Sequence, residues 1–171
     1  MASAYLKRCI MTKGYDFIMV RLDVDFHRRS LGVLVNIWNK NKNGFEEMDA
    51  LFDTGAHTCA IDIETFHRLG YDLETAVNAF VSTASSSREA VSRVRIEKMM
   101  LGDALLEKVM FNAFDFPLIS RPVIIGMNLI RQFEVSMNFK SKLITMKENY
   151  LCEGDDYYDA DTFGDWRIDN I

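Results

Sequence analysis

Apolar and polar residues alternate along most of the chain, a period-two pattern that is typical of β-strands with one buried face. Two such runs come first, at residues 15–24 and 31–38, and a third follows at 45–52. The turn signal Asn43-Gly44 lies between the second and third runs, and such pairs tolerate the positive φ of a tight hairpin. We therefore predict a strand followed by a β-hairpin.

The same alternation continues in the second half of the chain. A polar segment at 84–89 separates two of the runs, and Gly102-Asp103 is a second hairpin signal. The further predicted strands are 79–83, 91–100, 105–114, 133–139 and 142–147.

Helical signals are confined to two short segments. In residues 62–69, Asp62 is a good N-cap and Gly70 stands where a C-terminal stop is expected. A second short helix is predicted at 127–132, after a strand that ends at Gly126. Many short strands with two short helices predict an all-β fold, a closed or partly closed barrel.

Composition narrows the class of protein. The 171 residues suffice for one domain with a real core, and the net charge of −5 with scattered Lys and Arg argues against nucleic acid. No run approaches about 20 apolar residues, so no membrane span is predicted. Cys9, Cys59 and Cys152 form no close pair, and the N-terminus lacks the apolar region of a signal peptide. We therefore expect free thiols and a cytoplasmic location.

The composition changes at residue 148. From there to the end, eight acidic residues face one basic residue, with aromatic residues between them. We divide the chain into an N-terminal segment (1–14), a globular domain (15–147) and an acidic, aromatic tail (148–171). Because purely solvated acidic tails lack aromatics, we expect the tail to dock on a surface, its own or a partner's.

Asp53 stands at the most informative position. It ends the apolar run Leu51-Phe52 and is followed by Thr54, Gly55 and Ala56, before residues 57–61 return to apolar character. Thr54 can hydrogen-bond around the carboxylate, and Gly55 permits turn torsions that other residues resist. An acid at a bend between two buried strands is either a turn residue or a catalytic group.

Residues 15–147 resemble the retropepsin-type aspartic proteases. The resemblance rests on Leu51-Phe52-Asp53-Thr54-Gly55-Ala56, on Val123-Ile124-Ile125-Gly126 about seventy residues later, and on the order of the strands between them. It implies a retropepsin-like closed barrel. It also implies that the framework residues Ile124, Ile125 and Gly126 cross beneath the Asp-Thr-Gly loop.

The resemblance also implies a mechanism. In this family two aspartates share one proton and activate a water that attacks a peptide bond. Because the chain holds a single Asp-Thr-Gly, a working site requires a homodimer with Asp53 from each subunit. The expected partners are a peptide or protein substrate and a second copy, with no cofactor, metal ion, nucleic acid or membrane.

Two departures from the family pattern keep an alternative open. The position of the family's flap is taken by Ser82, Thr83, Ala84, Ser85, Ser86 and Ser87, which contain no glycine. His57 stands where a smaller polar residue is usual. The alternative is a catalytically inactive or autoinhibited module that binds peptides with the same fold.

Other candidate chemistry is weaker. His57 and Cys59, two residues apart, are predicted to share a strand face, and with His67 they suggest a metal site or a Cys-His nucleophile. No Gly-x-Ser-x-Gly supports a serine nucleophile at 85–87. Ordinary core or surface positions explain these residues better.

Overall fold

The computed structural model describes residues 10–11, 18–25, 30–74, 76–81, 89–102, 104–116 and 121–148. The predicted flap at 82–87 and the tail beyond residue 148 lie outside these residues. No helix in the described ranges is long and apolar enough to cross a membrane.

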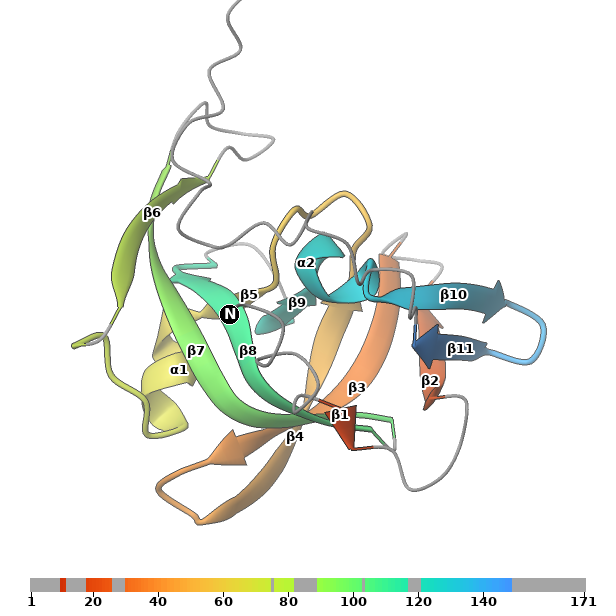
Figure 1. Cartoon of the computed structure of the whole chain (residues 1–171), viewed down its shortest axis with the longest axis horizontal. Helices are drawn as coiled ribbons and strands as arrows, with labels where there is room; N and C mark the ends of the chain where they lie inside the picture. The colour runs from red at the N-terminus through yellow and green to blue at the C-terminus, as the bar shows by residue number, and fades with distance from the viewer. Residues whose placement is uncertain are drawn as a thin grey trace, which may run out of the picture.

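Strands dominate the structure, and two short helices interrupt them (Figure 1). In chain order the elements are β1 (Ile10–Met11), β2 (Ile18–Asp25), β3 (Ser30–Asn39), β4 (Gly44–Phe52), β5 (Ala60–Asp62), α1 (Ile63–Arg68), β6 (Val77–Val81), β7 (Glu89–Leu101), β8 (Ala104–Phe114), β9 (Val123–Ile125), α2 (Met127–Ile130), β10 (Phe133–Asn138) and β11 (Leu143–Glu148).

The predicted all-β class is confirmed. The hairpin predicted from Asn43-Gly44 joins β3 to β4, and the positive φ of 48° lies at Asn43. The helix predicted at 127–132 is shorter, because α2 ends at Ile130. The two-residue strand β1, which pairs with β8, was not predicted.

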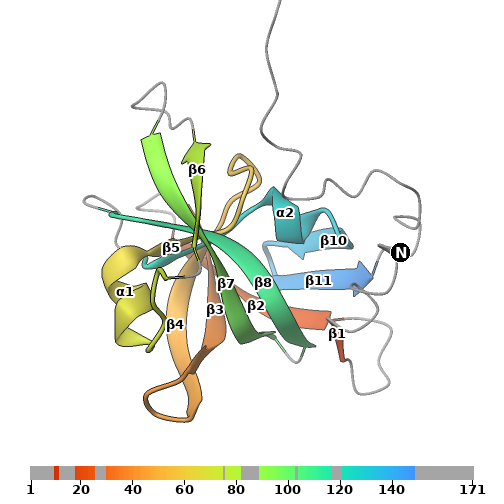
Figure 2. The same ribbon diagram turned by 60° about the vertical axis from the view of Figure 1, so that its left-hand side comes forward.

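The strands form one sheet in the order β10-β11-β2-β3-β4-β9-β5-β8-β7-β6, with β1 beside β8. An additional pairing between β3 and β7 closes a ring of six strands: β3, β4, β9, β5, β8 and β7. Outside the ring, β10, β11 and β2 lie together at one end of the sheet, and β6 pairs with β7 at the other end (Figures 1 and 2). Most pairs are antiparallel, but β9 runs parallel to β4 and β5 runs parallel to β8.

The main hydrophobic cluster draws on all six strands of the ring. β4 shows how the alternation fills it, because Met48, Ala50 and Phe52 are buried while Glu47 and Asp49 are exposed. Residues of both helices and of β10 and β11 complete the cluster. The side chains of alternate strand positions therefore point into the ring, as the period-two pattern predicts.

Helix α1 begins and ends as its sequence predicts. Asp62 is the N-cap, and its Oδ2 accepts a hydrogen bond from the Thr65 backbone N–H at 2.9 Å. Gly70, just beyond the helix, has φ +83°, the left-handed torsion that favours glycine after a helix.

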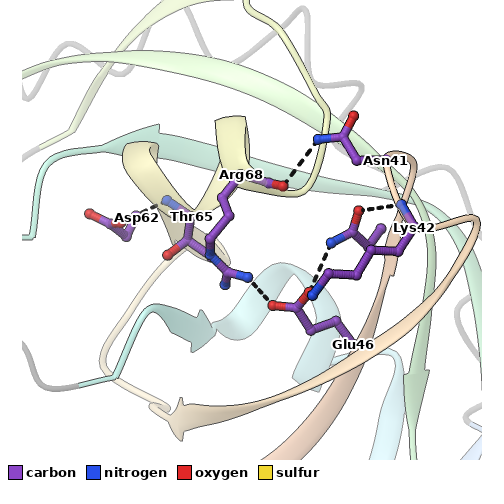
Figure 3. Close-up of polar contacts among 7 residues, drawn as sticks. Asn41, Lys42, Glu46, Asp62, Thr65 and Arg68 are labelled. Carbon is purple, nitrogen blue, oxygen red and sulfur yellow. Dashed lines mark hydrogen bonds and ion pairs between the residues drawn. The ribbon is translucent and has the colours of Figure 1, made fainter.

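The tip of the β3–β4 hairpin is fastened to the end of α1 by a polar network centred on Glu46 (Figure 3). The Glu46 carboxylate pairs with Lys42 Nζ at 2.8 Å and with the Arg68 guanidinium, and it accepts a hydrogen bond from Asn39 Nδ2 at 2.8 Å. Asn41 Nδ2 donates to the backbone carbonyl of Arg68. These contacts, those from Lys42 and Arg68 foremost, lower the pKa of Glu46 to about 2.

Candidate active site around Asp53

Asp53 lies just beyond the end of β4, where the backbone turns out of the ring. Its N–H donates to the carbonyl of Ile125 at 3.0 Å, so the loop stays joined to β9. Its Oδ1 accepts a hydrogen bond from Gly55 N–H at 2.8 Å, and its carbonyl accepts one from Ala56 N–H at 3.3 Å. Asp53 is partly buried, while Thr54 and Gly55 are exposed. The loop therefore presents a fixed carboxylate at its rim.

The framework residues lie directly behind this loop. β9 is inserted between β4 and β5, with Leu51 opposite Ile124 and Phe52 opposite Ile125. Ile124, Ile125 and Gly126 are buried. The structure thus brings the two sequence motifs together, seventy residues apart in the chain.

Hydrogen bonds from α2 hold the far side of the loop. Met127 N–H donates to the Ala56 carbonyl at 2.8 Å, and Asn128 N–H donates to the His57 carbonyl at 3.1 Å. The Asn128 side chain accepts from Cys59 N–H at 2.7 Å and donates to the Met110 carbonyl at 3.0 Å. Asn128 therefore ties the loop to both α2 and β8, a role that sequence reasoning missed.

Cys59 completes this support and is not a nucleophile candidate. Its side chain is fully buried, and its Sγ accepts a hydrogen bond from Gly126 N–H at 3.2 Å. Burial raises the pKa of the thiol to about 12, which keeps it neutral.

The prediction that His57 and Cys59 share a face is wrong. His57 is exposed while Cys59 is in the core, because the chain is still in the loop at His57 and enters β5 only at Ala60. His67 contacts the Tyr71 carbonyl through Nδ1. Within the part of the chain that the structure describes, no three His, Cys, Asp or Glu side chains are grouped to hold a metal ion.

A row of cross-strand neighbours runs through the site. Gly32, Leu51, Ile124, Ala60 and Asn112 are successive partners on β3, β4, β9, β5 and β8. Paired residues place their side chains on the same face of a sheet. Leu51 and Asp53 are two residues apart, and the bond from Asp53 N–H to the Ile125 carbonyl continues the β4–β9 pairing by one residue, so both face one way, opposite to Phe52 in the core.

This face carries a second, smaller hydrophobic cluster. Ala60, Phe116 and Ile124 form its buried part, with three partly buried residues packed against them: Leu51, Ala56 and Phe114. The cluster therefore includes Leu51 and Ala56, the residues on either side of Asp53-Thr54-Gly55 in the chain.

Two buried polar residues flank this cluster. Asn112 Oδ1 is buried and has no hydrogen-bond partner in the described residues. Arg121, which precedes β9, is buried as well. Neither was predicted, because Asn and Arg are ordinarily exposed and nothing in the sequence marks these two.

The predicted site residues thus separate into two groups. The active-site loop (Thr54, Gly55 and Ala56), Asp53 and the framework residues lie together. The predicted flap lies outside the described residues, between the ends of β6 and β7.

The family comparison covers this region. Residues 38–129, more than half of the chain, match the family model described as "Aspartyl protease". None of the curated protein sequences matches the chain significantly.

Solved structures share the fold. A retropepsin-like aspartic protease from Rickettsia conorii is 14% identical over 77% of this chain and 90% of its own, with a TM-score of 0.54. The retroviral protease-like domain of Ddi1 from Leishmania major is 15% identical over 70% and 94%, with a TM-score of 0.48. The first of these likenesses confirms the predicted retropepsin-like fold.

The matched region contains β4, the Asp53 loop and β9, which are the elements that build the site. The chain therefore belongs to the aspartyl protease family and has the retropepsin-like fold.

Proposed function

We propose that this protein is a homodimeric aspartic endopeptidase with Asp53 as its catalytic residue. The observation that carries the proposal is the fixed position of the Asp53 carboxylate. The carboxylate accepts a hydrogen bond from Gly55 N–H, and the Asp53 backbone N–H donates to the Ile125 carbonyl, on the face that bears an exposed loop and an apolar cluster. Family membership adds to this argument.

The chemistry requires two carboxylates that share one proton. The ionised carboxylate takes a proton from a bound water, whose oxygen attacks the scissile carbonyl carbon. The protonated carboxyl donates a hydrogen bond to the carbonyl oxygen, and a proton then passes to the leaving amine as the C–N bond breaks. Among the described residues, Gly55 N–H is the group that binds the Asp53 carboxylate, through Oδ1, so Oδ2 is left for water or a second carboxyl.

The second carboxyl must come from another copy, because the chain has one Asp-Thr-Gly. A two-fold axis beside Asp53 would place each residue next to its own copy, which is the natural geometry of a symmetric dimer.

The substrate class that we propose is an extended peptide with an apolar side chain. The small cluster around Leu51, Ala60 and Ile124 offers apolar surface beside the carboxylate. We also propose that the protein works in a reducing compartment such as the cytoplasm, since its described cysteine, Cys59, is a free thiol.

The test compares wild type, Asp53→Asn and Asp49→Asn on unstructured peptides between pH 4 and 7. Asp49 is an exposed residue of β4, the strand that leads into Asp53, and is the matched control for loss of one charge. We expect cleavage by wild type and Asp49→Asn, none by Asp53→Asn, and a dimer in sedimentation. Equal activity of all three proteins would refute the proposal.

The second candidate is a peptide-binding module that does not cleave. The glycine-free sequence at 82–87 favours it, because a stiffer flap would hold a peptide rather than cycle. A stable monomer that binds peptides and leaves them intact would establish this alternative.

A further inference from the structure

Arg121 is a buried cation that contacts one polar side chain, Ser30, among the described residues. Its exposed fraction is 7%, and its Nη1 donates to Ser30 Oγ at 2.7 Å. Among the described residues, no Asp or Glu forms an ion pair with it. A guanidinium has five N–H donors in a planar fork. Ser30 Oγ is the acceptor that this fork meets among the described residues, and none of the Arg121 nitrogens is a fully buried atom without a partner.

The guanidinium of Arg121 packs against Gly32. A Cβ at position 32 would be 2.5 Å from Arg121 Nη2, 2.9 Å from Cζ and 3.1 Å from Nε. The guanidinium therefore lies across the Cα of Gly32. Gly32 is not among the glycines with positive φ, so its backbone torsions do not demand glycine. The missing side chain serves to accommodate Arg121.

This position lies on the face of Asp53. The cross-strand partner of Gly32 is Leu51, which belongs to the small apolar cluster and precedes Asp53 by two residues. A ligand that packs on Leu51 beside the catalytic carboxylate would thus have the guanidinium at its edge.

We propose that Arg121 is a specificity-determining residue that binds the carboxylate of an extended peptide on the Asp53 face. A carboxylate matches the guanidinium fork with two parallel hydrogen bonds, and no Asp or Glu of the described residues occupies it. The inference rests on the proposed function and names its substrate class. That class is a peptide with Glu or Asp close to the apolar residue that contacts the cluster.

The carboxylate has two sources. It belongs either to a separate substrate or to the chain's own tail, which holds eight acidic residues from 148 onward. The chemistry is the same, so the experiment must separate the two.

The experiment measures peptide binding to the full chain carrying Asp53→Asn, so that turnover does not interfere. The probes are fluorescein-labelled decapeptides that differ by one Glu-for-Gln exchange, moved along the sequence, and the readout is anisotropy. We expect about tenfold tighter binding of the Glu peptide at one position, as is typical of a buried charge pair. Arg121→Gln should abolish this ratio, whereas Lys140→Gln, a change of an exposed cation, should keep it.

Gly32→Ala provides a second variant that keeps the cation but occupies its place. It should reduce the Glu-to-Gln ratio as Arg121→Gln does, and it carries the test if Arg121→Gln does not fold. Equal affinities for Glu and Gln peptides at every position would overturn the inference. An Arg121→Gln protein that keeps the Glu-to-Gln affinity ratio would also overturn it. If that protein loses dimerisation as well, the guanidinium serves the subunit contact.

The two sources are separated in the full chain by changing Asp155, Asp156, Asp159 and Asp161 to Asn. If the changed tail raises the affinity for the Glu peptide, and only while Arg121 is present, the tail carboxylates compete for Arg121. If the affinity is unchanged, Arg121 binds the carboxylate of a separate peptide. Failure of the proposed function is distinguishable. If wild type cleaves nothing but the ratio persists, catalysis is refuted and the binding preference holds.

Discussion

Gly126 packs directly against the backbone of Thr58. A Cβ at position 126 would lie 2.5 Å from the Thr58 carbonyl carbon and 2.6 Å from its oxygen. These are backbone atoms, so no side-chain rotation could relieve the contact. The close approach joins the end of β9 to the loop that follows Asp53, and it sets the position of both.

Replacing Gly126 with Ala should therefore destabilise the protein and remove peptidase activity. Overpacking of this kind costs about 1–3 kcal/mol of unfolding free energy, which urea denaturation would measure. Gly44→Ala is the matched control, because its nearest neighbour lies at 3.8 Å. Full activity and unchanged stability of the Gly126→Ala protein would contradict the role given to this contact.

The substitutions Asn128→Ala and Asn112→Ala provide a second comparison of stability. Asn128→Ala removes two hydrogen bonds and leaves the buried Cys59 N–H and the Met110 carbonyl unpaired, so we expect a loss of about 2–4 kcal/mol. Asn112→Ala removes an oxygen that has no partner in the described residues, and its cost should be smaller by at least about 1 kcal/mol. Denaturation of both variants decides the order, and a reversed order would disprove this account.

Glu46→Gln should lower stability by about 1 kcal/mol, the scale of a small ion-pair network with partly exposed members. The pKa of Glu46 falls from 4.5 to about 2 on folding. Its contribution is therefore complete above pH 4.5 and disappears as the pH falls toward 2. Thermal unfolding of both proteins across this range should show curves that converge in acid.

Glu47→Gln, a change of an exposed neighbour on the same strand, is the control for Glu46 and should leave the pH profile unchanged. A constant difference between wild type and Glu46→Gln down to pH 2 would exclude the network as its source.

Cys59 should resist alkylation while the protein is folded. Raising the pKa of the thiol from 9.0 to about 12 lowers the thiolate fraction at pH 8 by about a thousandfold. Mass spectrometry after iodoacetamide treatment, in a Cys9→Ser and Cys152→Ser background, would follow this position alone. Rapid modification of the native protein would show that Cys59 is accessible, against its burial in the core.

Local patterns predicted the elements whose causes are local. The β3–β4 hairpin follows from alternation and from the Asn43 turn, and the bounds of α1 follow from Asp62 and Gly70. The arrangement of Asp53 beside Ile125 came from the family resemblance, since no local rule joins residues seventy positions apart.

The features that escaped prediction depend on contacts that are distant in sequence. β1 exists only through its pairing with β8, and its two residues carry no periodic signal. An arginine is ordinarily predicted to be exposed, and the burial of Arg121 depends on its contact with Gly32, which is far from it in the sequence. Cys59 and His57 were assigned one face because alternation was extended into a loop, where it does not apply.

The pairing of β3 with β7 has a structural consequence. β7 bonds to β8 along most of its length, but its last residues, Met99–Leu101, also bond to β3, whereas Glu89–Arg93 bond to β6. β7 therefore serves two parts of the sheet: its C-terminal residues close the ring, whereas Glu89–Val91 pair with β6 alone, so among the described strands β6 is joined to the ring only through β7.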